Sequence, residues 1–92
     1  MNQVKVTANH FFELQIGNHT AYIEFEKTEA SILDLLHTQV PETLTGQGVG
    51  SKVVEGALNY CKENGLKVIP TCSFVKKYIK NNPQWSDLIA NQ

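Results

Sequence analysis

Residues 40–58 read Val-Pro-Glu-Thr-Leu-Thr-Gly-Gln-Gly-Val-Gly-Ser-Lys-Val-Val-Glu-Gly-Ala-Leu, and this stretch decides the fold. An apolar run ends at Val40, and Gly46, Gly48 and Gly50 then fall within five positions before an amphipathic segment. Alternating glycines let consecutive backbone N–H groups point into one concavity, because no Cβ blocks the approach. At the first turn of a helix such groups form an anion site, typically for phosphate. The stretch therefore predicts a phosphate-binding loop.

The sequence around the loop predicts an α+β fold with the element order βββαβα. Period-two alternation and a Gly17-Asn18 turn indicate a meander of three antiparallel strands before the loop. Apolar residues at helical spacing and then a short apolar run follow the loop. A strand–helix–strand unit of this length favours a parallel strand pair. The predicted elements are strands at 10–16, 19–26, 31–40 and 66–72, and helices at 49–64 and from Ser73 to just before Pro83.

The patterns also predict which side chains share a face. Strand 31–40 is apolar on both faces, which favours a central position, and strict alternation places His37 on the face of Leu33 and Leu35. Cys61 falls on the apolar face of helix 49–64 and is expected in the core. The last helix is expected to use Ser73 as its N-cap, and to bury Phe74, Val75, Tyr78 and Ile79.

Composition predicts one small domain over residues 1–92, and it argues against several classes of partner. The net charge of −1 argues against nucleic-acid binding. All eight cationic side chains are lysines, so a phosphate site must rest on backbone N–H groups and lysine charges. Two cysteines without metal-ligand spacing, and no signal or membrane-spanning segment, predict a cytoplasmic protein with reduced thiols and no metal. We expect a monomer or a weak homodimer without membrane contact.

Two common phosphate loops do not fit residues 46–51, because neither the P-loop spacing nor the dinucleotide fingerprint is present. Thr45-Gly46-Gln47-Gly48-Val49-Gly50 instead resembles the acetyl-CoA loop of the GCN5-related N-acetyltransferases, Q/R-x-x-G-x-G/A, with Thr45 in place of the leading residue. The segments His37-Thr-Gln-Val-Pro and Pro70-Thr-Cys-Ser-Phe-Val-Lys-Lys-Tyr-Ile-Lys-Asn-Asn-Pro resemble a minimal subfamily of that group. The resemblance covers roughly residues 8–85.

This resemblance implies acetyl-CoA as the cofactor and transfer of an acetyl group to an unidentified amine, on a small molecule or a protein. The strand edge near Val40 would hold the pantetheine arm. Lys76, Lys77 and Lys80 are expected on a solvated face, from which Lys76 or Lys77, with Lys77 selected, would contact the 3′-phosphate. Larger members insert two helices that build the acceptor site, whereas the Gly17-Asn18 connection is short, so an open acceptor side follows. The CoA pyrophosphate would bind the glycine loop, comprising Gly46, Gln47, Gly48, Val49, Gly50 and Ser51.

Three residues are candidates for catalysis, each with a structural alternative. His37 is a general base or a structural histidine, and the resemblance favours the base. Cys72 lines the thioester pocket or forms an acetyl-cysteine, and the first role is favoured. Tyr78 protonates the leaving thiolate or packs in the last helix. Rival functions are a CoA-binding module with little catalysis, and a lysine-rich domain that uses helix 73–82 to bind an acidic partner.

Overall fold

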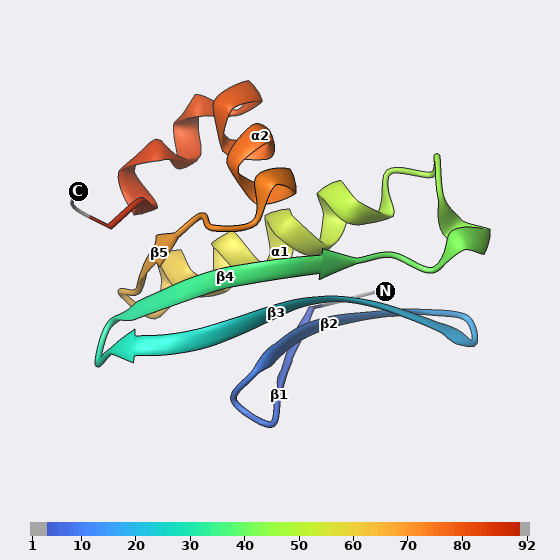
Figure 1. The fold of residues 1–92 in the computed structure, drawn as a ribbon, viewed down its shortest axis with the longest axis horizontal. Helices are drawn as coiled ribbons and strands as arrows, with labels where there is room; N and C mark the ends of the chain where they lie inside the picture. Colours follow the sequence, from blue (N-terminus) through green and yellow to red (C-terminus); the bar gives the residue numbers. More distant parts are fainter. Residues whose placement is uncertain (1–3, 91–92) are drawn as a thin grey trace.

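Four antiparallel strands and one parallel strand form a single sheet in the computed structural model, which describes residues 4–90. The strand order is β1-β2-β3-β4-β5, and only β4 and β5 run parallel. The single-domain prediction for residues 1–92 thus extends beyond the described part of the chain. The elements are β1 (Lys5–Thr7), β2 (Phe11–Ile16), β3 (His19–Glu29), β4 (Ile32–Gln39), the 3₁₀ segment η1 (Glu42–Leu44), α1 (Val49–Glu63), β5 (Lys67–Ile69), α2 (Ser73–Asn81) and the 3₁₀ segment η2 (Pro83–Leu88) (Figure 1).

The predicted α+β class, the meander and the parallel pair are confirmed, but β1 was missed. Its turn, Ala8-Asn9, has positive φ at both residues, as in a type I′ hairpin. Asparagine tolerates this conformation, whereas alanine does so at a cost, so the sequence carries no strong turn signal there. The strand predicted at 66–72 is shorter than expected, because β5 covers only Lys67–Ile69.

The core lies between one face of the sheet and the two helices. Helix α1 packs across β2 and β3, and α2 packs beside it against β4 (Figure 1). Each large apolar side chain that is fully buried stabilises the fold by about 1.5–3 kcal/mol. Cys61 lies in this core with no exposed surface, as predicted. The largest fully buried side chains belong to Phe12, Ile23, Leu35, Leu58, Val53, Val54, Val68, Val75 and Cys61.

A β-bulge in β4 overturns the predicted placement of His37. Leu35 pairs with Phe25, and His37 pairs with Glu24, so Leu36 is one extra residue on β4. The extra residue interrupts the alternation. Leu35 is fully buried on the helix-covered face, whereas His37 is exposed with Glu24 on the opposite face. The side chains that follow the bulge are therefore shifted by one position relative to a regular strand.

Helix α2 also departs from its predicted contacts. Its N-cap is Cys72, and Ser73 is the first helical residue. Val75 and Ile79 are buried, but Phe74 is 41% exposed and Tyr78 is half-buried, so the predicted buried face is too wide. Among residues 4–90, neither helix combines the length and apolar character needed to span a membrane.

Gly56 in the middle of α1 is required by packing rather than by backbone conformation. A Cβ built on Gly56 would lie 2.8 Å from the Cβ of Val4, which crosses the helix just before β1. No real side chain tolerates such an approach without movement. The absence of a side chain at Gly56 therefore lets the segment before β1 pack onto α1.

Gly56→Ala is expected to destabilise the protein by about 1–3 kcal/mol through overpacking. An ordinary glycine-to-alanine change inside a helix instead stabilises it by about 1 kcal/mol. Urea unfolding measures the difference, and the double variant Gly56→Ala/Val4→Ala should recover part of the loss, because it removes the clashing methyl groups. A Gly56→Ala variant more stable than wild type would contradict this contact.

Candidate functional site

The two parallel strands part after a short stretch, and this parting creates the site. Residues of β4 and β5 are paired only from Ile32↔Lys67 to Asp34↔Ile69. The Cys72 N–H then donates to the Leu35 carbonyl at 2.8 Å, and α2 begins at the next residue. Beyond this point β4 continues to Gln39, whereas β5 has ended. A strand edge of this kind offers backbone N–H and C=O groups to a ligand.

The glycine loop ends in a helix N-terminus whose backbone donors are free. Gly46 and Gly48 have φ of 85° and 74°, which glycine adopts readily, and Gly48 is the N-cap of α1. The first N–H bonded into the helix is that of Lys52, which donates to Gly48 O. Preceding N–H groups, from Val49 to Ser51, have no partner within the helix. The first turn has no acidic residue and no side-chain cap, so nothing there competes with an anion.

Gly50 has a different role from the other two glycines. It lies inside the first helical turn, and a Cβ there would approach the Cζ of Phe74 to 2.7 Å. The Phe74 ring from α2 therefore lies directly on the backbone of α1. This contact explains why Phe74 remains 41% exposed, because its ring lies against the opening of the site instead of in the core.

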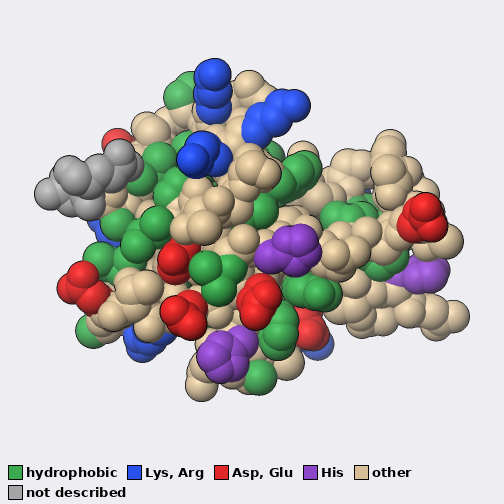
Figure 2. All heavy atoms as spheres, viewed as in Figure 1, with side chains coloured by type: hydrophobic (Ala, Val, Ile, Leu, Met, Phe, Trp, Pro, Cys, Tyr) green, Lys and Arg blue, Asp and Glu red, His purple; other side chains and the backbone are tan. Residues whose placement is uncertain are grey.

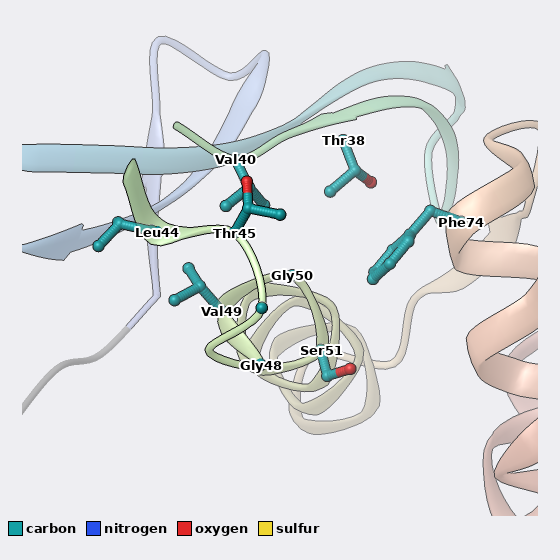
Figure 3. A pocket seen from close by; sticks show the side chains of 10 residues that line it. Thr38, Val40, Leu44, Thr45, Gly48, Val49, Gly50, Ser51 and Phe74 are labelled. Carbon is teal, nitrogen blue, oxygen red and sulfur yellow. The ribbon is translucent and has the colours of Figure 1, made fainter. Parts of the chain in front are cut away.

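These parts enclose a cavity of about 400 Å³ between β4, the glycine loop and α2. Figure 3 shows Thr38 of β4 and Val40, which directly follows β4, pointing into it, with Phe74 reaching in from the side of α2. The predicted cofactor residues Gln47 and Lys77 are not among its lining residues. The lining comprises the predicted residues Val40, Gly46, Gly48, Val49, Gly50 and Ser51, together with Thr38, Leu44, Thr45 and Phe74.

The sequence pointed to some of the four additional lining residues but not to the others. Thr45 occupies the leading position of the acetyl-CoA motif, and Leu44 precedes it. Thr38 faces the cavity because the bulge at Leu36 shifts the alternation, which the sequence does not reveal. Phe74 reaches the cavity only because Gly50 leaves room for its ring.

Cys72 lies behind the cavity and is linked to it through Thr38. Its Sγ is 3.3 Å from Thr38 Oγ1, and the residue is 8% exposed. Thr38 in turn lines the cavity, whereas Cys72 is not one of the lining residues. One hydroxyl therefore separates the thiol from the space that a ligand would occupy.

His37 lies on the other face of the sheet from the cavity. It follows Leu36 and precedes Thr38, so two neighbouring residues of β4 present a histidine and a hydroxyl to opposite faces. His37 Nε2 is 3.3 Å from Gln39 Oε1. With that oxygen as acceptor, Nε2 carries the proton and Nδ1 keeps a free lone pair. The geometry suits a proton acceptor on the uncovered face.

Tyr78 lies one helical turn after Phe74 and does not line the cavity. Burial raises the pKa of its hydroxyl, and the negative charge of Glu55 on α1 raises it further. The neighbouring indole of Trp85 lowers the Tyr78 pKa by a smaller amount, although the Trp85 N–H forms no hydrogen bond of normal geometry. A raised pKa keeps the proton on Tyr78 at neutral pH. Lys77 is exposed on the same helix.

A mixed sheet whose parallel strands part beside an uncapped helix N-terminus defines the chain as a small α+β protein. Residues 11–88 match the GCN5-related N-acetyl-transferase family, and this span includes the glycine loop and both helices. The chain therefore belongs to the GCN5-related N-acetyltransferases, which confirms the resemblance found in the sequence.

Similar proteins include Protein NATD1 of several vertebrates. The proteins of Gallus gallus and Homo sapiens are each 36% identical to the chain over 63 residues, which is 68% of this chain. The matches cover 57% and 56% of those relatives, so the chain spans less than two thirds of their length. The Danio rerio protein is 32% identical over 68 residues.

A solved structure has the same fold. The solution structure of a GCN5-like protein from Staphylococcus aureus superposes with a TM-score of 0.73 at 27% identity. The superposition covers 98% of this chain and 89% of that protein. It confirms the α+β architecture predicted from the sequence.

The two cysteines are expected to differ in reactivity. Burial raises the pKa of Cys61 from 9.0 to about 12, and the residue has no exposed surface. Because the thiolate is the nucleophile, iodoacetamide near pH 8 should alkylate Cys72 well before Cys61 in the folded protein. Peptide mapping by mass spectrometry measures both rates, and urea-unfolded protein, where the rates should converge, is the control. Faster labelling of Cys61 in the folded state would contradict this assignment.

Proposed function

We propose that the protein is an acetyl-CoA-dependent N-acetyltransferase that acts on a primary amine. The observation that carries this proposal is the uncapped N-terminus of α1, which opens into the 400 Å³ cavity beside the free edge of β4. Membership of the GCN5-related family supports it. The anion site suits the pyrophosphate of CoA, and the strand edge suits a ligand that carries amide groups.

The residues of the cavity suit each part of such a ligand. Backbone N–H groups from Val49 to Ser51 donate to phosphate oxygens, and the Ser51 hydroxyl adds a donor. Thr38 lies on β4 where its edge is unpaired, Val40 directly follows the strand, and both suit contacts with the pantetheine arm. The Phe74 ring covers the apolar side of the arm. No arginine contributes, since the chain contains none.

The chemistry requires a neutral amine and an acceptor for its proton. Acetyl-CoA, when bound, supplies an acyl group activated as a thioester. His37 takes the proton of the incoming ammonium at Nδ1, whose lone pair is free when Gln39 accepts from Nε2. Thr38 lines the cavity and contacts the thioester end, and its Oγ1 lies 3.3 Å from Cys72 Sγ, so that Cys72 acts through Thr38. Tyr78 holds its proton as an acid, one helical turn from Phe74.

A CoA-binding module with little catalysis is the second candidate. The observation that favours it is the composition of the cavity wall, which contains no histidine, carboxylate or lysine. The proposed base lies on the opposite face of β4. If acetyl-CoA binds without reaching past the strand edge, no proton acceptor contacts the acyl group, and only binding remains.

Ser51→Glu separates the proposed anion site from general effects on folding. A carboxylate in the first turn of α1 should raise stability by about 0.3–1 kcal/mol, because it complements the helix dipole. It should also weaken CoA binding by about tenfold or more, since it repels the pyrophosphate. Calorimetry with CoA and urea unfolding measure the two effects, and Ser51→Gln is the neutral control. Unchanged CoA affinity in Ser51→Glu would contradict the site.

Acetyl transfer itself distinguishes the two candidates. Wild-type protein incubated with acetyl-CoA and a lysine-containing peptide should raise the peptide mass by one acetyl group. His37→Gln should slow transfer about 10²-fold or more while CoA binding is retained, because only the proton acceptor is lost. Cys72→Ala should retain transfer unless the thiol forms an acetyl-cysteine. CoA binding with no transfer to any amine would support the binding module instead.

A further inference from the structure

A second cavity lies near the opposite end of α1 from the glycine loop. Its volume is about 250 Å³, and its lining residues come from the end of the sheet where β3 turns into β4. Helix α1 has 15 residues, so its two ends are about 20 Å apart (Figure 1). The two cavities share no lining residue, so the second is separate from the proposed anion site. Its lining comprises Val6, Asn9, Phe25, Lys27, Leu33, Tyr60 and Leu66.

Apolar side chains form most of the wall of this second cavity. Phe25 and Leu33 are buried in the core, and Val6 and Leu66 are half-buried beside them. A preformed cavity with such walls takes up apolar groups, and an apolar cavity of about 150 Å³ is large enough to bind benzene. By the same measure, a volume of 250 Å³ holds an apolar body of about ten non-hydrogen atoms.

Two aromatic side chains contribute to the wall from different elements. Phe25 belongs to β3 and Tyr60 to α1, and both pack against the ring of Phe12, with centroid distances of 4.7 Å and 5.5 Å. Aromatic pairs are favourable in tilted and edge-to-face arrangements of this kind. An aromatic ring in the cavity would extend the same cluster, so the wall favours an aromatic body over an aliphatic one.

Lys27 is the only cationic side chain that lines the cavity. It follows Phe25 by two residues on β3, so alternation places both side chains on the helix-facing side of the sheet. Glu26 lies between them and pairs with Asp34 on the other face; Figure 2 shows acidic side chains gathered over the strands. Within residues 4–90, no carboxylate oxygen lies within 4.0 Å of the Lys27 ammonium. Its positive charge is therefore available to a ligand.

The other polar groups at the cavity are compatible with an anion. The end of a helix normally favours cations, because its last carbonyl groups lack partners. Here the Asn64 N–H donates to the Tyr60 carbonyl at 3.1 Å, and the Leu66 N–H donates to the Cys61 carbonyl at 2.8 Å. The Tyr60 hydroxyl and the Asn9 amide add uncharged donors to the lining, which contains no carboxylate.

We propose that this cavity binds a small aromatic monocarboxylate. The ring occupies the apolar space beside Phe25 and Leu33, and the carboxylate lies at Lys27, where the lining is exposed. A carboxylate suits this position because lysine donates charge-assisted hydrogen bonds to it. The proposal does not depend on acetyl transfer, because the glycine loop and the edge of β4 take no part in it.

Titration of ¹⁵N-labelled protein with 3-phenylpropionate and with its uncharged analogue 3-phenylpropanamide tests the proposal. At millimolar concentration the acid should produce saturable shifts at the amides of Val6, Phe25 and Leu66. The amides from Gly48 to Ser51 should not change. Lys27→Gln keeps much of the side-chain stem but removes the charge, so it should weaken the acid by about tenfold and the amide by less than about twofold.

Two further variants complete the experiment. Lys62→Gln removes the same charge from an exposed position on α1 outside the lining, and it should change the affinity for the acid by less than about twofold. Leu66→Phe adds atoms at the cavity wall and should abolish binding of both ligands. If Leu66→Phe does not fold, the comparison of Lys27→Gln with Lys62→Gln still decides the result.

Three results would overturn the proposal. Equal loss of affinity in the two lysine variants would show that only net charge matters, and equal affinity of the wild type for acid and amide would remove the role of the carboxylate. Shifts confined to the amides from Gly48 to Ser51, or no shifts at about 10 mM acid, would exclude binding in this cavity. A separate titration with CoA bears only on the proposed function, so the two proposals can fail independently.

Discussion

The hydrogen bond from the Cys72 N–H to the Leu35 carbonyl marks the end of the parallel part of the sheet, and the site depends on it. Before this bond, β4 and β5 are paired. After it, the chain turns into α2 and leaves the edge of β4 open. The extra residue at Leu36 comes directly after the same point. A single position on β4 therefore ends the strand pairing, exposes backbone groups and changes which side chains face the cavity.

The proposed roles of the cavity, Thr38 and His37 all depend on this position of β4. The parting of the strands makes room for a cavity, and the N-terminus of α1 supplies unpaired donors at its far end. The bulge directs Thr38 to the cavity and His37 to the sheet face that the helices leave uncovered. A cofactor and an acceptor amine would thus approach β4 from opposite faces.

The glycine loop and the strand–helix–strand unit were predictable, because both depend on local signals. Gly46 and Gly48 mark positive φ, and the apolar spacing of residues 49–61 is that of a helix. The face of His37 was not predictable, since strict alternation gives no sign of an inserted residue such as Leu36. The exposure of Phe74 depends on space above Gly50, which only the packed helices reveal. Strand β1 was missed because Ala8 adopts a conformation that sequence patterns assign to glycine or asparagine.

The proposed function depends on CoA binding between the N-terminus of α1 and the open edge of β4. Titration of ¹⁵N-labelled protein with CoA, followed by amide chemical shifts, tests it most directly. The largest shifts should fall on the amides from Gly48 to Ser51 and from Thr38 to Val40, with little change at the C-terminal end of α1. Saturable shifts confined to other elements, or none at millimolar CoA, would contradict it.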